Sequence, residues 1–120
     1  MVVFIATSKQ FYPDAKRLVS NLRAAGVRVH HPYFDLDSDA VDSDPELKQQ
    51  ATLRHFPEIN ACDVLYALTP DGYAGSSVTI ELTYAYARGK RIIASESPAE
   101  FAFRAMVAEI YSPSDLHAHL

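Results

Sequence analysis

Short apolar runs rich in β-branched residues alternate along this chain with segments whose apolar residues recur every three or four positions. The runs predict buried strands, because a strand covered on both faces reads as continuous hydrophobic sequence, and the periodic segments predict amphipathic helices. The predicted strands cover 2–6, 27–30, 64–68, 92–94 and 106–111. The predicted helices cover 13–25, 47–59 (interrupted or bent near Pro57), 76–88 and a short terminal segment that begins within 112–116.

This alternation restricts the topology. Strand–helix–strand units with short connections form right-handed crossovers and a parallel sheet. We therefore predict one domain over residues 1–120: a small doubly wound, flavodoxin-like or Rossmann-like α/β fold with five parallel strands and helices on both faces. Ligands of such sheets bind beyond the carboxyl ends of the strands, near the point where the strand order reverses. Residues 7–12, 70–81 and 95–98 should converge there.

Composition excludes several classes of protein. Over 120 residues, 11 Lys and Arg stand against 15 Asp and Glu, a net charge of −4 that argues against a general nucleic-acid binder. The single cysteine, Cys62, forms no internal disulfide and no cysteine-rich zinc site. The apolar start is short and lacks a basic leader, so it predicts a strand rather than a signal peptide or a membrane span. We expect a soluble, cytoplasmic protein with no membrane or nucleic-acid partner.

The most informative segment is DGYAGSSVTIE at 71–81, which joins the third strand to the next helix. Small residues let a ligand approach the backbone, and free N–H groups at a helix start favour an anion. Glu81 should lie about one turn into the helix and face the same crevice. The alternative is a simple capped helix with Glu81 supporting the helix dipole. Neither a Walker loop nor a GxGxxG fingerprint is present.

Several groups of residues together resemble the nucleoside 2-deoxyribosyltransferase-like superfamily, which includes the transferases and the deoxynucleotide N-glycoside hydrolases. The groups are Phe4-Ile5-Ala6-Thr7-Ser8 with Phe11-Tyr12; His55-Phe56 with Ile59, Cys62 and Asp63; Gly72-Tyr73-Ala74-Gly75-Ser76; Glu81 through Ala87; and Gly89-Lys90. They span nearly the whole chain. The resemblance implies that Glu81 is a nucleophile that attacks the anomeric carbon of a 2-deoxyribosyl group. A second acidic group would protonate the departing base.

The chain departs from that pattern in the loop before the helix. Transferase members usually carry an Asp six residues before the glutamate, and here that position is Gly75. Asp71 is a candidate for the missing catalytic acid, and Glu96 is a second candidate. In the hydrolase branch a loop serine contacts the 5′-phosphate, which makes Ser76 and Ser77 candidates for that contact.

Further candidates for substrate binding follow the first strand and lie in the glycine loop. Thr7 and Ser8 would contact a sugar or a phosphate, although a polar loop is an equal explanation. Phe11 would stack on a base, or pack at the helix start. Tyr73 would form an aromatic lid, with Gly75 allowing close backbone approach.

The acidic stretch 35–46 partly matches a calcium loop, with Asp35, Asp37, Asp39 and Glu46 at positions one, three, five and twelve. Ala40 replaces the glycine that such a loop requires, so a solvated loop is favoured, and we expect no metal and no cofactor. The resemblance implies a homodimer or a higher homo-oligomer whose site is completed across subunits.

Two functions remain open on the sequence. The first is transfer or cleavage of the N-glycosidic bond of a 2′-deoxynucleoside or its 5′-monophosphate, with this small molecule as substrate. The second is a non-catalytic nucleotide-binding or regulatory module of the same fold, which the loss of the loop Asp favours. A nucleotide sensor linked to a toxin or to defence is a third function that the sequence does not address.

Overall fold

The computed structural model describes residues 1–32, 34 and 43–120. Five strands form one sheet in the order β2-β1-β3-β4-β5, and every neighbouring pair is parallel. The strands are β1 (Val2–Thr7), β2 (Arg28–His30), β3 (Val64–Leu68), β4 (Arg91–Ala94) and β5 (Glu109–Ile110). This is the strand order of a flavodoxin-like doubly wound sheet, so the predicted fold class is confirmed.

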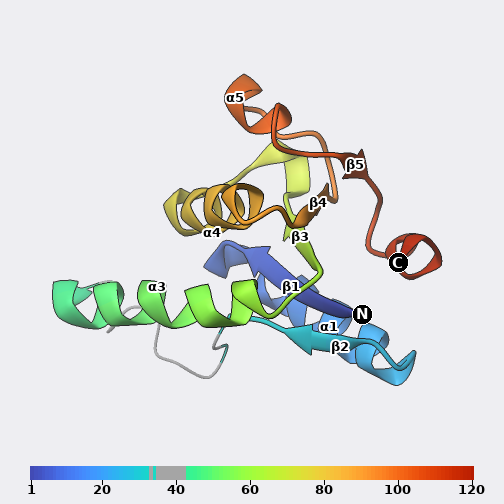
Figure 1. The fold of residues 1–120 in the computed structure, drawn as a ribbon, viewed down its shortest axis with the longest axis horizontal. Helices are drawn as coiled ribbons and strands as arrows, with labels where there is room; N and C mark the ends of the chain where they lie inside the picture. Colours follow the sequence, from blue (N-terminus) through green and yellow to red (C-terminus); the bar gives the residue numbers. More distant parts are fainter. Residues whose placement is uncertain (33, 35–42) are drawn as a thin grey trace.

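Helices cover both faces of this sheet (Figure 1). One face carries α1 (Tyr12–Ala24) and the 3₁₀ turn η3 (Leu116–His119), and the other carries α3 (Pro45–Asn60) and α4 (Ser76–Ala87). Short turns η1 (Lys9–Phe11), η2 (Pro70–Gly72) and α5 (Phe101–Arg104) lie in the connections. None of the helices in the described ranges combines the length and the apolar character needed to cross a bilayer.

The strands divide the core into two clusters, one on each face. Val3 and Ile5 of β1 pack with the buried side of α1, whereas Phe4 and Ala6 pack with α3 and α4. Successive side chains of a strand point to opposite faces, and this alternation accounts for the division. The five residues from Val3 to Thr7 are all buried, as expected for a strand covered on both sides.

The helix α3 runs without interruption past Pro57. Its start is capped by Asp44, whose Oδ1 accepts the N–H groups of Glu46 at 3.0 Å and Leu47 at 3.3 Å. The sequence predicted an interruption or bend near Pro57, but the helix continues to Asn60. Because His55 and Ile59 are buried on either side of Pro57, packing holds this last turn helical despite the missing N–H donor.

Two connections differ from the sequence prediction. The strand predicted over 106–111 is only two residues long, because the N–H of Met106 bonds to the carbonyl of Phe103 at 3.0 Å and closes the turn after α5. The single turns η2 and α5 were not predicted. The partial calcium-loop match falls mostly on residues 35–42, outside the described residues, while Glu46 lies in the first turn of α3.

Candidate functional site

The three loops that the topology predicts to converge are hydrogen-bonded to one another. The β1–α1 loop meets the β3–α4 loop where the N–H of Gly75 donates to Ser8 Oγ at 3.3 Å. The β3–α4 loop meets the β4–α5 loop where the N–H of Asp71 donates to Glu96 Oε2 at 2.9 Å. These contacts make the carboxyl edge of the sheet one connected surface.

A close backbone approach fixes the β3–α4 loop at Gly72. The carbonyl of Gly72 accepts the N–H of Ala99 at 3.0 Å, and its φ of 78° lies in the left-handed region. A Cβ added at Gly72 would lie 2.7 Å from the carbonyl oxygen of Ser97 and 2.8 Å from the nitrogen of Ala99. Asp71 also has a positive φ, 56°, which is uncommon for a residue with a side chain. This loop geometry therefore requires glycine at position 72.

Gly75 is less restricted than Gly72, because its φ of −76° is open to any residue. A Cβ at this position would lie 3.0 Å from Ser8 Oγ, a tight contact that a small shift of the serine side chain would relieve. The β3–α4 loop therefore lies close against Ser8.

The other predicted binding residues of this edge have different environments. Thr7 is buried, and its Oγ1 donates to the carbonyl of Leu68 at 3.3 Å, which links β1 to β3. Phe11 and Tyr73 meet edge to face, with ring centroids 6.0 Å apart. Tyr73 is 50% exposed, so one face of this aromatic pair is open to solvent.

Glu81 lies between α4 and α3 rather than at the surface. It is 5% exposed, and its Oε1 is 2.7 Å from Nδ1 of His55, which is also buried. The ring of Phe4 packs edge-on against the imidazole with centroids 5.6 Å apart. The sequence predicted that the Glu81 carboxylate faces the crevice at the strand ends. In the structure the carboxylate is buried between α3 and α4 instead, in contact with His55, to which the sequence analysis gave no role.

Burial dominates the electrostatics of Glu81. Desolvation raises the pKa of the Glu81 carboxyl above its usual value, while the hydrogen bond from His55 and the charges of His55 and Lys48 oppose the rise. Oε2 of Glu81 is buried and has no hydrogen-bond partner among the described residues. Leaving such an oxygen unpaired costs about 1–3 kcal/mol of stability, which makes this oxygen a candidate for a functional role.

A second polar cluster lies between α3 and α4, at the first turn of α4. Lys48 of α3 donates to Ser77 Oγ at 3.3 Å, while Ser76 is exposed. The N-terminal cap of α4 is Gly75, which has no side chain to accept the first N–H groups. The uncapped N–H groups and the Lys48 ammonium lie at the same turn. An anion bound there would accept hydrogen bonds from the N–H groups and would be attracted by the charge of Lys48.

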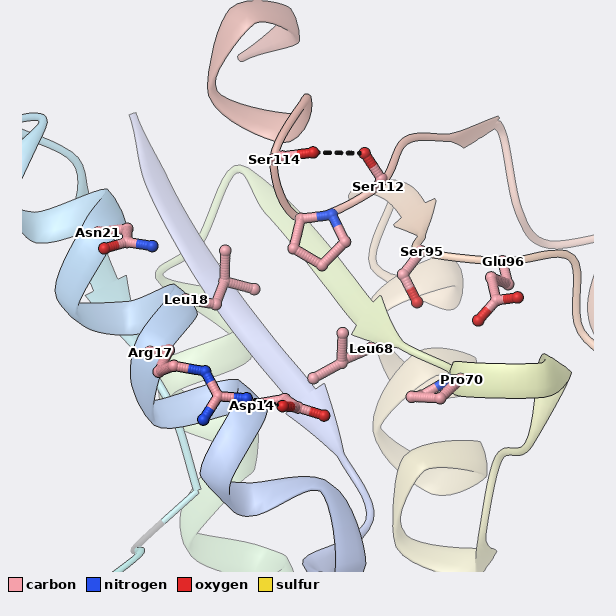
Figure 2. Close-up of a pocket in the computed structure, with 11 residues that line it drawn as sticks. Asp14, Arg17, Leu18, Asn21, Leu68, Pro70, Ser95, Glu96, Ser112 and Ser114 are labelled. Carbon is pink, nitrogen blue, oxygen red and sulfur yellow. Dashed lines mark hydrogen bonds and ion pairs between the residues drawn. The ribbon is translucent and has the colours of Figure 1, made fainter.

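An open cavity of about 490 Å³ lies on the opposite face of the sheet (Figure 2). Its walls include Asp14, Arg17, Leu18 and Asn21 of α1 on one side and Ser95, Glu96, Ser112 and Ser114 on the other. Glu81 does not line it. Of the candidate residues, only Glu96 borders this cavity, so the predicted site residues divide between two sides of the sheet.

The candidate acids are also separated from Glu81. Asp71 and Glu96 meet each other through a backbone N–H, and neither is hydrogen-bonded to Glu81 in the described part of the chain. Among the same residues, no group of three or more His, Cys, Asp and Glu side chains is placed to hold a metal ion.

Sequence reasoning missed the two side chains of α3 that contact α4. Lys48 and His55 are seven residues apart, which is two helical turns, so they share one face of α3. Ser77 and Glu81 are four residues apart, about one helical turn, so they share one face of α4. Because the two spacings differ, only the packing of the helices shows that Lys48 meets Ser77 and that His55 meets Glu81.

Comparison with known proteins identifies the fold. A 2-deoxyribosyltransferase from Bacillus psychrosaccharolyticus superposes with a TM-score of 0.68 at 16% identity, over 97% of this chain and 90% of that one. A conserved protein from Enterococcus faecalis V583 superposes with a TM-score of 0.68 at 16% identity, over 100% of this chain and 99% of that one. The chain has the nucleoside 2-deoxyribosyltransferase-like fold.

A third structure with the nucleoside 2-deoxyribosyltransferase-like fold is the CMP N-glycosidase of Clostridium botulinum, with a TM-score of 0.54 and 18% identity over 92% of this chain and 87% of that one. No protein-family model and no curated protein sequence matches the chain. The likeness at these identities concerns the fold, and it confirms the fold that the sequence motifs predicted.

Proposed function

We propose that this protein transfers or cleaves the N-glycosidic bond of a 2′-deoxynucleoside or its 5′-monophosphate, with Glu81 as the nucleophile. The observation that carries the proposal is the buried carboxylate of Glu81, held by His55 through one oxygen while the other has no hydrogen-bond partner in the described residues. Two proteins of the same fold are a 2-deoxyribosyltransferase and a CMP N-glycosidase, which supports this class of chemistry.

The proposed reaction has two steps. An oxygen of Glu81 bonds to the anomeric carbon as the bond from that carbon to the base nitrogen breaks, and the bonding electron pair leaves with the base, which takes up a proton. Water or a second base then attacks the same carbon and releases the carboxylate. Asp71 and Glu96 remain the candidate proton donors in the proposal, since both lie on the connected carboxyl edge.

Substrate must reach an oxygen that is buried in the described conformation. The helices α3 and α4 pack side by side (Figure 1). Glu81 of α4 lies between them, where its Oε1 is 2.7 Å from Nδ1 of His55 of α3. The proposal therefore requires that α3 and α4 separate, or that the loop before α4 moves, when substrate binds. Closure over the sugar then excludes water from the oxocarbenium-like transition state.

The start of α4 favours the 5′-monophosphate over the nucleoside. A phosphate at this turn would accept hydrogen bonds from the hydroxyl groups of Ser76 and Ser77 and from the uncapped N–H groups of the helix. Lys48 would add a charge-assisted hydrogen bond. Ser8 and the ring pair of Phe11 and Tyr73 lie on the adjoining loops, where they would contact the sugar and the base.

A second candidate function is a nucleotide-binding module without catalysis. Two observations favour it: Gly75 stands where the transferases that the sequence resembles carry an aspartate, and Glu81 is only 5% exposed. Under this alternative the same edge would bind a nucleotide, and the Glu81–His55 pair would only join the two helices.

The experiment that tests the proposal measures release or exchange of free base over a panel of 2′-deoxynucleosides, their 5′-monophosphates and CMP. Glu81→Gln and Glu81→Ala are compared with Glu109→Gln, which removes a carboxylate that pairs with Arg91 on the strand edge. We expect base release by the wild type and by Glu109→Gln only, with a glycosyl adduct on Glu81 visible by mass spectrometry after rapid denaturation. Release that persists in Glu81→Ala contradicts the nucleophile, and binding without any release supports the module.

A further inference from the structure

We propose that His55 is the positioning residue for Glu81: its Nδ1–H holds Oε1, so that Oε2 is the oxygen presented to the anomeric carbon. This inference rests on the proposed function and assigns a second residue to that same site. The two side chains come from different helices and are 26 positions apart in the sequence, yet Nδ1 lies 2.7 Å from Oε1.

The surroundings of His55 limit the movement of its ring. The side chains of His55 and Glu81 are 11% and 6% exposed. Phe4 of β1 packs edge-on against the imidazole at 5.6 Å and 62°, which leaves the ring little freedom to rotate. Because the donor is held in place, its hydrogen bond to Oε1 also fixes the position of Oε2. A nucleophile must be oriented in this way toward the atom that it attacks.

The direction of the hydrogen bond follows from the chemistry of the nucleophile. A carboxylate that attacks must be ionised, and an ionised carboxylate only accepts hydrogen bonds. Nδ1 of His55 therefore carries the hydrogen in the reactive state. Burial raises the pKa of Glu81, and this bond opposes the rise, so His55 keeps a larger fraction of Glu81 ionised at a given pH.

Other charged groups act on the same carboxyl group. In the described part of the chain these are Lys48 and Glu58, both on α3: the Lys48 ammonium lowers the pKa of Glu81 and the Glu58 carboxylate raises it. The strand β1 contributes the apolar ring of Phe4 to this cluster. The hydrogen bond with His55 is the largest of the effects that favour the ionised form.

A purely structural pair would be an expensive way to join two helices. A buried ion pair or polar pair is often replaced by apolar side chains of similar volume at no loss of stability. Here one carboxylate oxygen is left without a hydrogen-bond partner in the described residues, which adds to the cost. Among the described residues, the imidazole of His55 on α3 is the polar side chain that is hydrogen-bonded to Glu81.

The test compares His55→Leu with His55→Asn, whose amide nitrogen can take the place of Nδ1. Leu53→Ala on the exposed side of α3 is the matched control, because Leu53 is 61% exposed. Each variant is assayed with the 2′-deoxynucleoside 5′-monophosphate that the wild type turns over fastest. Three quantities are measured: kcat with KM, the pH profile of kcat/KM, and the carboxyl ¹³C titration of Glu81 by NMR, assigned with Glu81→Gln.

We expect His55→Leu to lower kcat about 100-fold with KM nearly unchanged, as misplacement of a reacting group does. Its acidic limb of kcat/KM and its Glu81 titration should both move to higher pH. His55→Asn should recover most of the rate, and Leu53→Ala should stay within about twofold of the wild type. If His55→Leu does not fold, His55→Phe, which keeps an aromatic ring and lacks the donor, takes its place in all three measurements, with the same expected loss of rate and the same shift of the Glu81 titration.

Two contrary results are distinguishable. If activity requires Glu81 but neither the rate nor the Glu81 titration changes in the His55 variants, the positioning role is wrong and the proposed function stands. If the wild type releases no base, or Glu81→Gln releases it at the wild-type rate, the proposed function fails and the catalytic role of His55 fails with it.

Discussion

Two carboxylates in this protein each meet a basic side chain, and their pKa values move in opposite directions. On the strand edge, Glu109 of β5 accepts from Nε and the terminal nitrogen of Arg91 at 2.5 and 2.8 Å, with both side chains about one-third exposed. The hydrogen bond from Arg91 lowers the pKa of the Glu109 carboxyl. Between the helices, Glu81 meets His55 at 2.7 Å, and burial nevertheless raises its pKa.

This difference shows that a basic hydrogen-bond partner does not by itself decide whether the pKa of a carboxyl group rises or falls. For the buried Glu81, the desolvation penalty exceeds the effect of the hydrogen bond from His55. The one-third-exposed carboxylate of Glu109 keeps part of its hydration, so the hydrogen bond from Arg91 decides the direction of its pKa. The Arg91 hydrogen bond therefore favours the ionised form of Glu109, whereas burial disfavours the ionised form of Glu81. A buried carboxyl group with a raised pKa near the carboxyl edge of a doubly wound sheet is typical of a functional group.

The largest expected difference between the two pairs is in activity. Glu81→Gln should lower base release at least about 1,000-fold, because an amide oxygen is a poor nucleophile, while Glu109→Gln should stay within about twofold of the wild type. The measurement is steady-state base release on the best substrate of the panel. Equal losses in the two variants would show that both act through the fold rather than through chemistry.

The next effect concerns the two cations that border the two sides of the sheet. Lys48 contacts Ser77 at the start of α4, and Arg17 lies at the cavity on the α1 face, where it pairs with Asp14. Lys48→Met should raise KM for the 5′-monophosphate about tenfold, worth about 1.4 kcal/mol, and leave KM for the nucleoside nearly unchanged. Arg17→Met should change neither KM. If Arg17→Met raises KM and Lys48→Met does not, the phosphate binds in the cavity of Figure 2 and not at the start of α4.

A smaller effect is expected in stability at neutral pH. Glu81→Gln should raise the free energy of unfolding by about 1 kcal/mol, because it removes a buried charge and keeps a hydrogen-bonding group beside His55. Glu109→Gln should lower it by about 0.2–1 kcal/mol, the range of exposed ion pairs. Urea titration of the three proteins measures both. A stability loss in Glu81→Gln would show that the buried pair is a net structural contact.

The smallest effect is the pH dependence of these stability differences. Folded Glu81 keeps its proton to a higher pH than the unfolded chain does, so stability falls as pH rises from the unfolded value near ~4.3 through the raised pKa. The advantage of Glu81→Gln should therefore be absent in acid and grow with pH. Glu109 behaves oppositely: its lowered pKa gives stability above the unfolded value that is lost as pH falls. Urea titrations across the acid range should show slopes of opposite sign for the two variants.

Most of the fold could be predicted from the sequence, and the candidate site only in part. The run 64–68 was predicted with its observed bounds, because its five residues are apolar and end at a turn signal. Pro57 was misread, since burial of His55 and Ile59 overrides the local preference of proline. The convergence of Ser8, Gly75 and Asp71 follows from topology alone, and the structure contains it.

The sequence by itself determined the order of strands and helices, the parallel sheet and the edge at which its loops meet, because all of these follow from local periodicity and the handedness of crossovers. Only the tertiary structure decided that α3 lies against α4, and so that His55 reaches Glu81. Desolvation depends on every atom that surrounds a carboxylate, and these atoms come from distant parts of the chain. For that reason the direction of the Glu81 pKa could not be predicted from its neighbours in sequence.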